Sequence, residues 1–344
     1  MKLPINYKAA VLVKNNQPLK IYSIEFRGPL KVGQVLTKIY YSGICGKQIE
    51  EIQGKMGKDK FLPHCLGHEA VGEVVMIGPG VKNVKIKDKV VVHWMKGSGI
   101  ESETPDLYYN NKKINAGLCT TFSEYSILSE NRVTRIEENK NLKLLSFFGC
   151  VASTGIGCIL NEANVKLYHR VAVIGVGSLG LCLIMGAKLA NAKEIIAFSN
   201  RKNANTKVKT FGGNLLSKFN AKKYINYFDK VFISSTESKN IQYAHSILNY
   251  GGELFVVGVP SPKDIIKIKS LDIHFDKKTR GSYGGSIKPQ RDIPTYINLQ
   301  KQKKINLKHL VIKEYQLKDI NIPIMKMLNK KSPIGRYLIR MKRK

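Results

Sequence analysis

The stretch Arg170-Val171-Ala172-Val173-Ile174-Gly175-Val176-Gly177-Ser178-Leu179-Gly180 joins an apolar run to a G-x-G-x-x-G pattern. A short continuous apolar run is typical of a strand buried on both faces of a parallel sheet. In this pattern the first glycine makes a tight turn, the second lets the backbone approach a pyrophosphate, and the third permits close helix packing. The N-terminus of the following helix offers free N–H groups to the anion. We therefore predict a dinucleotide-binding loop formed by Gly175, Gly177, Ser178, Leu179 and Gly180.

Helices and strands alternate on both sides of this loop. Ser153 and Thr154 are suited to cap a helix that ends near Ala163. After the loop, the apolar spacing predicts helices over 178–190, 203–211 and 241–248, with strands over 194–198, 230–234 and 253–257. Such alternation is typical of βαβ units. The fold class is therefore α/β, with a doubly wound parallel sheet in this part of the chain.

The residues after the second predicted strand bear on the choice between NAD and NADP. An acidic side chain usually binds the ribose 2′-hydroxyl there. This chain has Ser199-Asn200-Arg201-Lys202 instead. Ser199, Asn200 and Arg201 can hydrogen-bond and neutralise a 2′-phosphate, which a carboxylate would repel. We expect NADP(H) to be favoured over NAD(H); the alternative is that Arg201 and Lys202 belong to a generally basic surface and the pocket takes NAD.

The first part of the chain has a different pattern. Short β-rich runs over 8–13, 35–40, 71–75 and 89–94 are separated by turn-forming residues. Residues 96–117 are rich in Gly, Ser, Asn and Lys, and we expect a long loop there. The prediction is a mainly antiparallel, barrel-like or sandwich-like domain.

The chain has 344 residues, enough for two domains or one large one, and it is strongly basic. Lys and Arg number 57 against 25 Asp and Glu, a formal net charge of +32. This charge would attract polyanions. However, the lysines are spread along the whole chain, and there is one Trp and no recognisable nucleic-acid motif. Binding of nucleic acid is therefore not expected.

The location of the protein can also be anticipated. Residues 1–21 contain no apolar leader segment, and no apolar run is long enough to span a bilayer. The six cysteines form neither a C-x-x-C pair nor a dense framework. We expect a cytoplasmic protein with reduced thiols and no membrane partner.

Three separated features could together form a metal site. They are Cys45, the pair His68-Glu69, and Cys150. Two thiolates and one imidazole with an open fourth position are a ligand set of catalytic zinc. Each residue alone would more often be structural.

At this point the chain resembles the zinc-dependent medium-chain alcohol dehydrogenases, and the resemblance covers essentially its whole length. It is carried by motifs at the spacing found in that family: Gly67-His68-Glu69 with Gly72, Gly78 and Val81; Gly149-Cys150; Ser153-Thr154-Gly155; the glycine loop; Gly251-Gly252 to Gly258-Val259-Pro260; Gly284-Gly285; and Gly335-Arg336.

The resemblance implies a fold and a set of roles. A GroES-like catalytic domain (1–152 and 285–344) would surround an inserted Rossmann domain (153–284). Zinc would be bound by Cys45, His68 and Cys150, with Glu69 beside it or as a transient ligand. Thr154, Val257 and Gly258 would contact the cofactor, and Arg336 would reach its pyrophosphate or remain a surface charge. A homodimer or homotetramer is the habit of the family.

Two departures from the family pattern affect these expectations. Residues 93–117 lack the four cysteines that usually bind a structural zinc, so we predict one catalytic zinc per subunit. Lys47 stands where Ser or Thr commonly relays the substrate proton, and Gln48 where an acid is frequent. Lys47 would move the proton itself, attract an anionic substrate or simply face solvent. His93 follows a strand and could line the pocket.

The function favoured by these features is hydride transfer between NADP(H) and an alcohol, polyol or sugar, or the corresponding carbonyl compound. Zinc would act as a Lewis acid in this reaction. The alternatives are an NAD-linked dehydrogenase, a zinc-free quinone or enoyl reductase, and a redox-inactive protein that binds an anionic partner through its basic surface. Lys47 and the positive potential favour an anionic substrate.

Overall fold

The computed structural model describes residues 3–55, 57–138, 140–201, 203–216, 221–235 and 237–341. The chain divides into two compact units, which are treated separately below. The first comprises Met1–Cys150, Lys288–Lys301 and Val311–Lys344, and the second comprises Val151–Ile287 and Gln302–Leu310. Residues 151–152, 285–287 and 302–310, which the resemblance places in the GroES-like domain, lie in the second unit.

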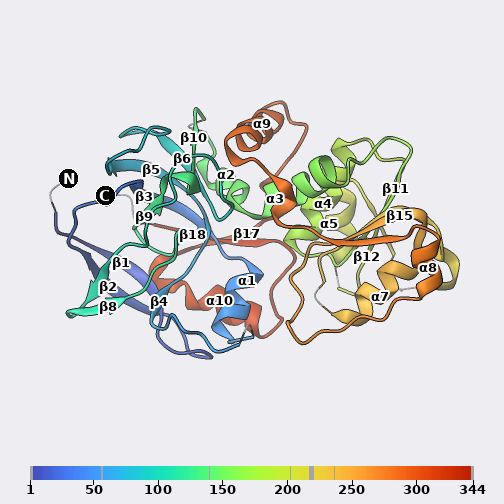
Figure 1. Ribbon diagram of the computed structural model, residues 1–344, viewed down its shortest axis with the longest axis horizontal. Coiled ribbons are helices and arrows are strands. Elements are labelled where there is room, and N and C mark those ends of the chain that lie inside the picture. Colours follow the sequence, from blue (N-terminus) through green and yellow to red (C-terminus); the bar gives the residue numbers. More distant parts are fainter. Residues whose placement is uncertain are drawn as a thin grey trace. The chain divides into compact units, whose positions relative to one another are not determined.

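The first unit is mainly β, as the sequence predicts (Figure 1). Within its described residues, one sheet has the order β4 (His64–Cys65), β1 (Ile5–Leu12), β2 (Lys20–Phe26), β7 (Leu107–Tyr109) and β8 (Lys112–Ile114). The other has the order β10 (Val133–Ile136), β6 (Lys89–His93), β5 (Glu69–Ile77), β3 (Gln34–Gly43), β18 (Arg336–Arg340) and β17 (Val311–Gln316), with β9 (Tyr125–Ser129) also paired to β3. All pairings are antiparallel except β17 with β18. The C-terminal strands β17 and β18 therefore continue a sheet that begins with β3, a strand from the first part of the chain.

The predicted long loop over 96–117 is only partly a loop. It contains β7 and β8, which form an antiparallel hairpin that extends the first sheet through the pairing of β2 with β7. Asn110 and Asn111 both have positive φ angles at the turn. Asparagine tolerates this conformation, which two-residue hairpin turns require. The sequence signal for this hairpin was the Asn110-Asn111 pair within a Lys-rich segment.

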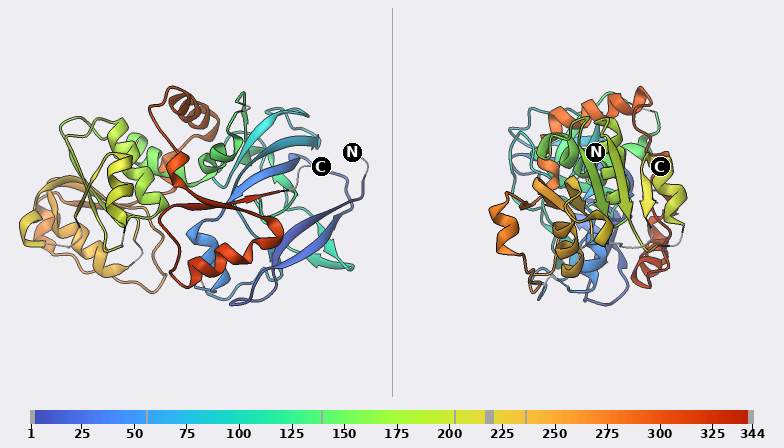
Figure 2. Two further views of the ribbon diagram at one scale, coloured as in Figure 1. Left: turned by 180° about the vertical axis from the view of Figure 1, so that it is seen from behind. Right: turned by 90° about the vertical axis from the view of Figure 1, so that its right-hand side faces the viewer.

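Short helices complete the first unit: α1 (Gly46–Ile52), α2 (Leu142–Leu145), α9 (Pro289–Lys301) and α10 (Asn321–Leu328). Helix α1 and helix α10 are far apart in the sequence but lie side by side in the structure (Figures 1 and 2). Ile49 and Ile52 of α1 are buried in the same apolar cluster as Ile324 of α10. This packing fixes the position of α1, which begins directly after Cys45.

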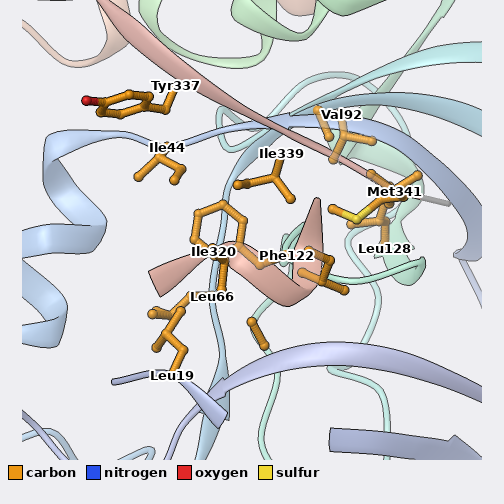
Figure 3. Packing of buried hydrophobic residues seen from close by; sticks show 14 of the residues in the cluster. Leu19, Ile44, Leu66, Val92, Phe122, Leu128, Ile320, Tyr337, Ile339 and Met341 are labelled. Carbon is orange, nitrogen blue, oxygen red and sulfur yellow. The ribbon is translucent and has the colours of Figure 1, made fainter. Parts of the chain in front are cut away.

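Apolar side chains adjacent to the predicted metal ligands anchor the site to the core of the first unit. Figure 3 displays Ile44, Leu66 and Tyr337 in one cluster; their exposures are 0%, 4% and 2%. Ile44 precedes Cys45, Leu66 lies two residues before His68, and Tyr337 follows Arg336. Because each anchor is buried, the backbone that carries each polar residue is held in place.

The second unit contains the predicted parallel sheet. Within its described residues the order is β13 (Asn214–Leu216), β12 (Glu194–Phe198), β11 (Arg170–Ile174), β14 (Phe228–Ile233), β15 (Leu248–Val256) and β16 (Lys278–Gly281), and every pair is parallel. Counted from β11, this is the order 3-2-1-4-5-6 of a doubly wound dinucleotide-binding fold. The strand order reverses between β11 and β14, and ligands bind at the carboxyl ends of the strands at such a point.

The helices of this unit are α3 (Val151–Gly157), α4 (Ser178–Leu189), α5 (Ala204–Phe211), α6 (Ala221–Tyr224), α7 (Ser238–Ser246) and α8 (Ser270–His274). The predicted cap at Ser153 and Thr154 is wrong. Both residues lie inside α3, which begins earlier and continues as a π-helical turn over Cys158–Glu162. They are buried there, at 0% and 8% exposure, so packing decides their place rather than their capping preference.

Within the described ranges, no single helix is long and apolar enough to cross a membrane. Only the two short segments Leu142–Gly149 and Val151–Glu162, taken together, reach that length and composition.

Candidate metal and cofactor sites

Three separated segments of the first unit bring Cys45, His68 and Cys150 together. Their ligand atoms all lie within 4.8 Å of one another. Cys45 occupies the position between β3 and α1, His68 directly precedes β5, and Cys150 follows a 3-10 turn over Ser146–Gly149. Among the described residues, this is the one group of three or more His, Cys, Asp or Glu side chains arranged to hold a metal ion.

The two thiols are strongly coupled to each other. A hydrogen bond with Cys150 lowers the pKa of Cys45 well below its ordinary value, against the opposing effect of burial, and the Arg336 charge lowers it further. The same hydrogen bond, together with burial, raises the pKa of Cys150. When Cys45 is a thiolate, Cys150 keeps its proton and donates it to Cys45 in their hydrogen bond. A thiolate is the form of cysteine that binds metal.

Glu69 and Arg336 form a buried ion pair beside this cluster. Arg336 Nε lies 3.0 Å from Glu69 Oε1, and the two side chains are 3% and 0% exposed. Arg336 Nη1 also donates to the carbonyl oxygen of Ile44 at 3.2 Å. The carboxylate and the nearby thiols raise the pKa of Arg336 despite its burial, so the guanidinium stays charged. The expectation of a surface charge at Arg336 is wrong.

Gln48 connects two of the three candidate ligands. Its Oε1 accepts a hydrogen bond from the Cys45 backbone N–H at 2.7 Å, as in a helix capping box, and its Nε2 lies 2.5 Å from His68 Nδ1. The side chain is 1% exposed. In the sequence, Gln48 stands out only as a departure from the family pattern, yet the spacing Cys45-x-x-Gln48 is the signal of the capping interaction.

Lys47 is on the first turn of α1 and is half-buried. Its Nζ lies 3.4 Å from Glu50 Oε2, and the two side chains are 27% and 26% exposed. Glu50 was not identified from the sequence. The spacing of three residues on a helix was the available signal, since such positions are neighbours.

The donor set fits a zinc ion. Two thiols and an imidazole, with no fourth His, Cys, Asp or Glu in the group among the described residues, match a catalytic site with an open position. His68 Nε2 is buried and has no nitrogen or oxygen hydrogen-bond partner within the described part of the chain, while, against the effect of burial, a contact with Cys45 helps to raise the pKa of His68. The charges of a zinc ion, two thiolates, Glu69 and Arg336 would cancel, as a buried site requires.

The glycine loop of the second unit joins the end of β11 to the start of α4. Gly175 follows β11 with φ of +93°, and Ser234 Oγ donates to its carbonyl oxygen at 2.9 Å. A Cβ at Gly180 would collide with the Gly175 carbonyl, whereas a Cβ at Gly177 would meet no described atom within 4 Å. Gly177 is the N-cap residue of α4, and because it has no side chain it cannot cap the N–H groups of the first turn of α4. The open space at Gly177 is thus suited to a phosphate group.

Apart from Arg336, the other candidate cofactor residues also lie in the second unit. Ser199 is 7% exposed and its Oγ accepts from the Arg201 backbone N–H at 3.2 Å, while Asn200 and Arg201 are exposed. Lys202 lies outside the described residues. The N–H groups of Val257 and Gly258 both donate to the Ile233 carbonyl, at 2.9 and 3.0 Å. Thr154 Oγ1 is buried without a hydrogen-bond partner among the described residues.

His93 does not have a free face toward a pocket. It is 0% exposed, and its two ring nitrogens lie 2.7 Å from the Met95 carbonyl oxygen and 2.9 Å from Thr134 Oγ1. Burial lowers its pKa to about 4, so it is neutral. The expectation that His93 lines the pocket is replaced by a structural role in β6.

The buried side chain of Glu130, which was not identified from the sequence, holds part of residues 93–117, the segment without the four cysteines of the family pattern. The Glu130 carboxylate is 2% exposed and accepts backbone N–H groups of Lys82, Asn83 and Ile100 at 2.6, 2.7 and 2.8 Å. These hydrogen bonds lower the pKa of Glu130 although burial opposes them. The Glu130 carboxylate therefore connects the loop at Lys82 and Asn83 to the loop at Ile100.

Comparisons with known proteins agree with this description. Residues 31–138 match the model of the alcohol dehydrogenase GroES-like domain, and residues 178–302 match that of the zinc-binding dehydrogenase domain. An S-(hydroxymethyl)glutathione dehydrogenase of Synechocystis is 27% identical, over 91% of this chain and 94% of its own. Alcohol dehydrogenase 6 of Peromyscus maniculatus is 29% identical, over 94% of this chain and 96% of its own.

Solved structures share the fold. The benzyl alcohol dehydrogenase of Acinetobacter calcoaceticus has a TM-score of 0.88 at 22% identity, covering 98% of this chain and 100% of its own. These matches confirm the GroES-like and Rossmann domains. The matched domains, the relatives along nearly the whole chain and the Cys45–His68–Cys150 group agree that the chain belongs to the zinc-dependent medium-chain alcohol dehydrogenases.

Proposed function

We propose that this protein is an NADP(H)-linked, zinc-dependent dehydrogenase that interconverts an alcohol, polyol or sugar and the corresponding carbonyl compound. The observation that carries this proposal is the convergence of Cys45, His68 and Cys150 within 4.8 Å. When bound, zinc supplies Lewis acidity to the substrate oxygen and the nicotinamide supplies or accepts the hydride.

The residues around the metal position hold it and balance its charge. Cys45, His68 and Cys150 are the proposed ligands, and Cys45 is favoured as a thiolate by the hydrogen bond from Cys150. Glu69 is the proposed neighbour or transient ligand, held by Arg336. Because Arg336 is engaged by Glu69 and by the Ile44 carbonyl, its proposed effect on a cofactor phosphate is secondary to this structural role.

Lys47 is the proposed proton carrier. It follows Cys45 by two residues on the first turn of α1, and its ammonium group pairs with Glu50 at 3.4 Å. An ammonium and a carboxylate in contact can pass a proton between them, and both side chains are partly exposed. In this proposal Lys47 gives a proton to the substrate oxygen or takes one from it, and Glu50 connects Lys47 to solvent.

The proposed preference for NADP(H) rests on the end of β12. No carboxylate follows Phe198; the residues there are Ser199, Asn200 and Arg201. Arg201 is the proposed partner of a 2′-phosphate because its charge is opposite to that of the phosphate, and Ser199 shapes the turn by accepting the Arg201 N–H. An NAD-linked enzyme remains the alternative, in which Arg201 is only part of the basic surface.

An anionic substrate is the favoured class within the alcohols. The support is the net charge of +32 and a lysine, Lys47, two residues from a proposed metal ligand. Several relatives are named S-(hydroxymethyl)glutathione dehydrogenase, and the glutathione adduct in that name carries carboxylate groups. A panel should therefore contain this adduct, sugar phosphates, polyols and simple alcohols, each assayed with NADP and NAD.

The assembly and setting are also proposals. We propose one catalytic zinc per subunit, since residues 93–117 have no cysteine. A homodimer or homotetramer is supported by the edge strand β16 and by the exposed Leu271, Ile273 and Tyr283 near it. Six cysteines without a disulfide support a cytoplasmic setting.

Metal analysis of protein expressed without added zinc tests the central claim. The expected result is one zinc per chain, lost together with the dehydrogenase activity in Cys150→Ser. Absence of zinc, or full activity in Cys150→Ser, would favour a zinc-free reductase or a redox-inactive binding protein. A matched control is Cys182→Ser, which removes a buried thiol of the second unit that is outside the metal group.

A further inference from the structure

We infer that the second unit carries a further ligand site, at the amino ends of its strands, for a small organic anion that contains a planar ring. The site is a cavity of about 490 Å³, which we term the amino-end cavity. It is lined by residues 168–170, Lys193, residues 229–230 and residues 250–252. Ligand pockets commonly have volumes of about 300–1,000 Å³, so the cavity is large enough for a small molecule.

The amino-end cavity is separate from the glycine loop. Arg170, which lines the cavity, is the first residue of β11, whereas Gly175 follows the last residue of the same strand. A strand of five residues spans about 13 Å at roughly 3.3 Å per residue. Because β11, β12 and β14 are parallel, the residues at their amino ends gather at the edge of the sheet opposite to the loop. A ligand here would therefore be a second one, distinct from the cofactor.

An irregularity between β14 and β15 forms one wall of the cavity. Phe228 of β14 pairs with Leu248 of β15, and two residues later Lys230 pairs with Glu253. The strand β15 thus contains extra residues between these two pairs, and they leave the regular ladder. Among them, Gly251 has a φ of +70°, and a Cβ at this position would meet no described atom within 4 Å. The backbone at Gly251 therefore borders open space.

The lining carries more positive than negative charge. Arg170, Lys193 and Lys230 are cationic, and Asp229 is the one carboxylate among the lining residues. Two of the cations have partners: Arg170 Nη2 lies 3.1 Å from Asp229 Oδ1, and Lys230 pairs with Glu253. Lys193 is exposed and has no ion-pair partner among the described residues. It is therefore the cation available to form a charge-assisted hydrogen bond with an anion.

The residue after Lys193 does not neutralise it. Glu194 accepts a hydrogen bond from the Tyr227 hydroxyl, which raises the pKa of Tyr227. Within the described part of the chain, Glu194 and Lys193 form no ion pair. The charge of Lys193 is thus left to solvent or to a ligand.

His169 supplies a second donor to the cavity. The Lys166 N–H donates to His169 Nδ1 at 3.0 Å, and the His169 N–H donates to the Lys166 carbonyl oxygen at 3.0 Å. A backbone N–H is always a donor, so Nδ1 accepts and the proton of the neutral imidazole lies on Nε2. Burial and the charge of Lys230 lower the pKa of His169, which keeps the ring neutral at pH 7. The Nε2–H has no acceptor among the described residues and is available to an anion.

Two tyrosine rings border the cavity. Tyr168 and Tyr250 are 65% and 51% exposed, although each ring is supported from one side. The ring of Tyr168 lies edge-on to His169 with centroids 4.6 Å apart, and that of Tyr250 packs on Phe275 with centroids 4.8 Å apart. Aromatic rings attract one another in stacked and edge-on arrangements. A planar ring in the ligand would therefore bury tyrosine surface that is now in contact with water.

These groups together define the class of ligand. A phosphate or carboxylate group would accept hydrogen bonds from the Lys193 ammonium group and the His169 Nε2–H. A planar ring attached to it would pack against Tyr168 or Tyr250. The inference does not depend on the proposed function, because no proposed zinc ligand or cofactor residue lines the cavity.

Isothermal titration calorimetry of the full-length protein provides the test. The probes are 4-nitrophenyl phosphate, 4-nitrobenzoate as its carboxylate counterpart, and inorganic phosphate as the anion without a ring. Lys193→Ala should weaken binding of the tighter ring-bearing probe by roughly tenfold. Tyr168→Ala should weaken the same probe and leave the affinity for inorganic phosphate unchanged. The tighter of the two ring-bearing probes identifies the anionic group.

The matched controls are Lys239→Ala and Tyr283→Ala, an exposed lysine and an exposed tyrosine of the same unit that do not line the cavity. Both should bind the probes as the wild type does. The inference is overturned if neither ring-bearing probe binds at millimolar concentration, or if Lys193→Ala or Tyr168→Ala binds them as tightly as the wild type.

Two further outcomes would also overturn the inference. Equal affinity for inorganic phosphate and 4-nitrophenyl phosphate would mean that the ring is not recognised. Displacement of the ring-bearing probe by NADPH would place the probe in the cofactor site. Zinc content and dehydrogenase activity are measured separately, so a failure of this inference is distinguishable from a failure of the proposed function.

Discussion

Arg336 and Glu69 are separated by 267 residues in the sequence and form an ion pair at 3.0 Å with almost no exposure to solvent. Glu69 is the first residue of β5 and Arg336 the first of β18, and both strands flank β3 in the same sheet. Gly43, at the end of β3, leaves room for the carboxylate, since a Cβ at this position would collide with it. The pair therefore depends on the register of three strands.

Breaking this pair from one side should destabilise the protein strongly. Arg336→Met leaves the Glu69 carboxylate buried without a counter-charge, which costs about 3–5 kcal/mol. The double variant Glu69→Gln with Arg336→Met should cost less than the sum of the two single variants. Urea unfolding of metal-free protein measures both. The control Lys31→Met removes one member of an exposed ion pair with Glu103 and should lower the free energy of unfolding far less. If the costs of the two single variants of the buried pair simply add in the double variant, the prediction is contradicted.

Two of the three glycines of the loop, Gly177 and Gly180, should respond differently to alanine. Gly177→Ala places a methyl group in open space, so the thermal midpoint should stay unchanged while cofactor affinity falls by roughly tenfold, ~1.4 kcal/mol. Gly180→Ala drives a methyl group into the Gly175 carbonyl and should lower the thermal midpoint. Calorimetry and fluorescence titration with NADPH separate the two effects. Unchanged affinity in Gly177→Ala would argue against phosphate binding at this turn.

Arg201→Asp should reverse the cofactor preference. A charge-assisted hydrogen bond to a 2′-phosphate is replaced by repulsion, and we expect NADP(H) affinity to fall by roughly thirtyfold or more while NAD(H) affinity changes little. Lys239→Asp, an exposed lysine of the same unit, controls for the change in overall charge. An equal effect of Arg201→Asp on both cofactors would refute the assignment of the 2′-phosphate site.

Glu130 should make stability depend on pH. Its folded-state pKa is depressed below the unfolded value of about 4.3. The carboxylate therefore stabilises the fold above that value, and its contribution is lost as the pH falls through the folded-state pKa. Glu130→Gln should cost roughly 1–3 kcal/mol at neutral pH and less in acid. Urea unfolding at several pH values measures the difference in free energy of unfolding between the wild type and Glu130→Gln. The control is Glu103→Gln, at an exposed position. A difference that does not vary with pH would exclude this role of Glu130.

Lys47→Met should slow the reaction without loss of metal. If Lys47 carries the proton, kcat falls by roughly 100-fold and its dependence on pH changes, because general acid–base groups commonly contribute this much. Glu50→Gln should act in the same direction. Lys58→Met, an exposed lysine shortly after α1, serves as the control. An unchanged kcat and pH profile in Lys47→Met would leave Lys47 as a solvated side chain.

Local patterns were sufficient for much of the second unit. β11 and β12 coincide with the predicted strands 170–174 and 194–198, and α4 begins at the predicted Ser178. Apolar runs and glycines in the loop determine these elements through short-range sterics and burial. The predicted helix cap at Ser153 and Thr154 is wrong because burial within α3 outweighs the preference of their hydroxyl groups for a cap position.

By itself, the sequence determined the class of the fold, the glycine-rich turn after β11 and the three candidate metal ligands, because each is carried by residue types at a recognisable spacing. Only the tertiary structure decided how these groups are held. Arg336 meets Glu69, Gln48 meets His68 and Glu130 meets three distant N–H groups through strand register and loop packing. Such contacts join residues far apart in the chain, so their energies depend on burial and geometry that no local pattern contains.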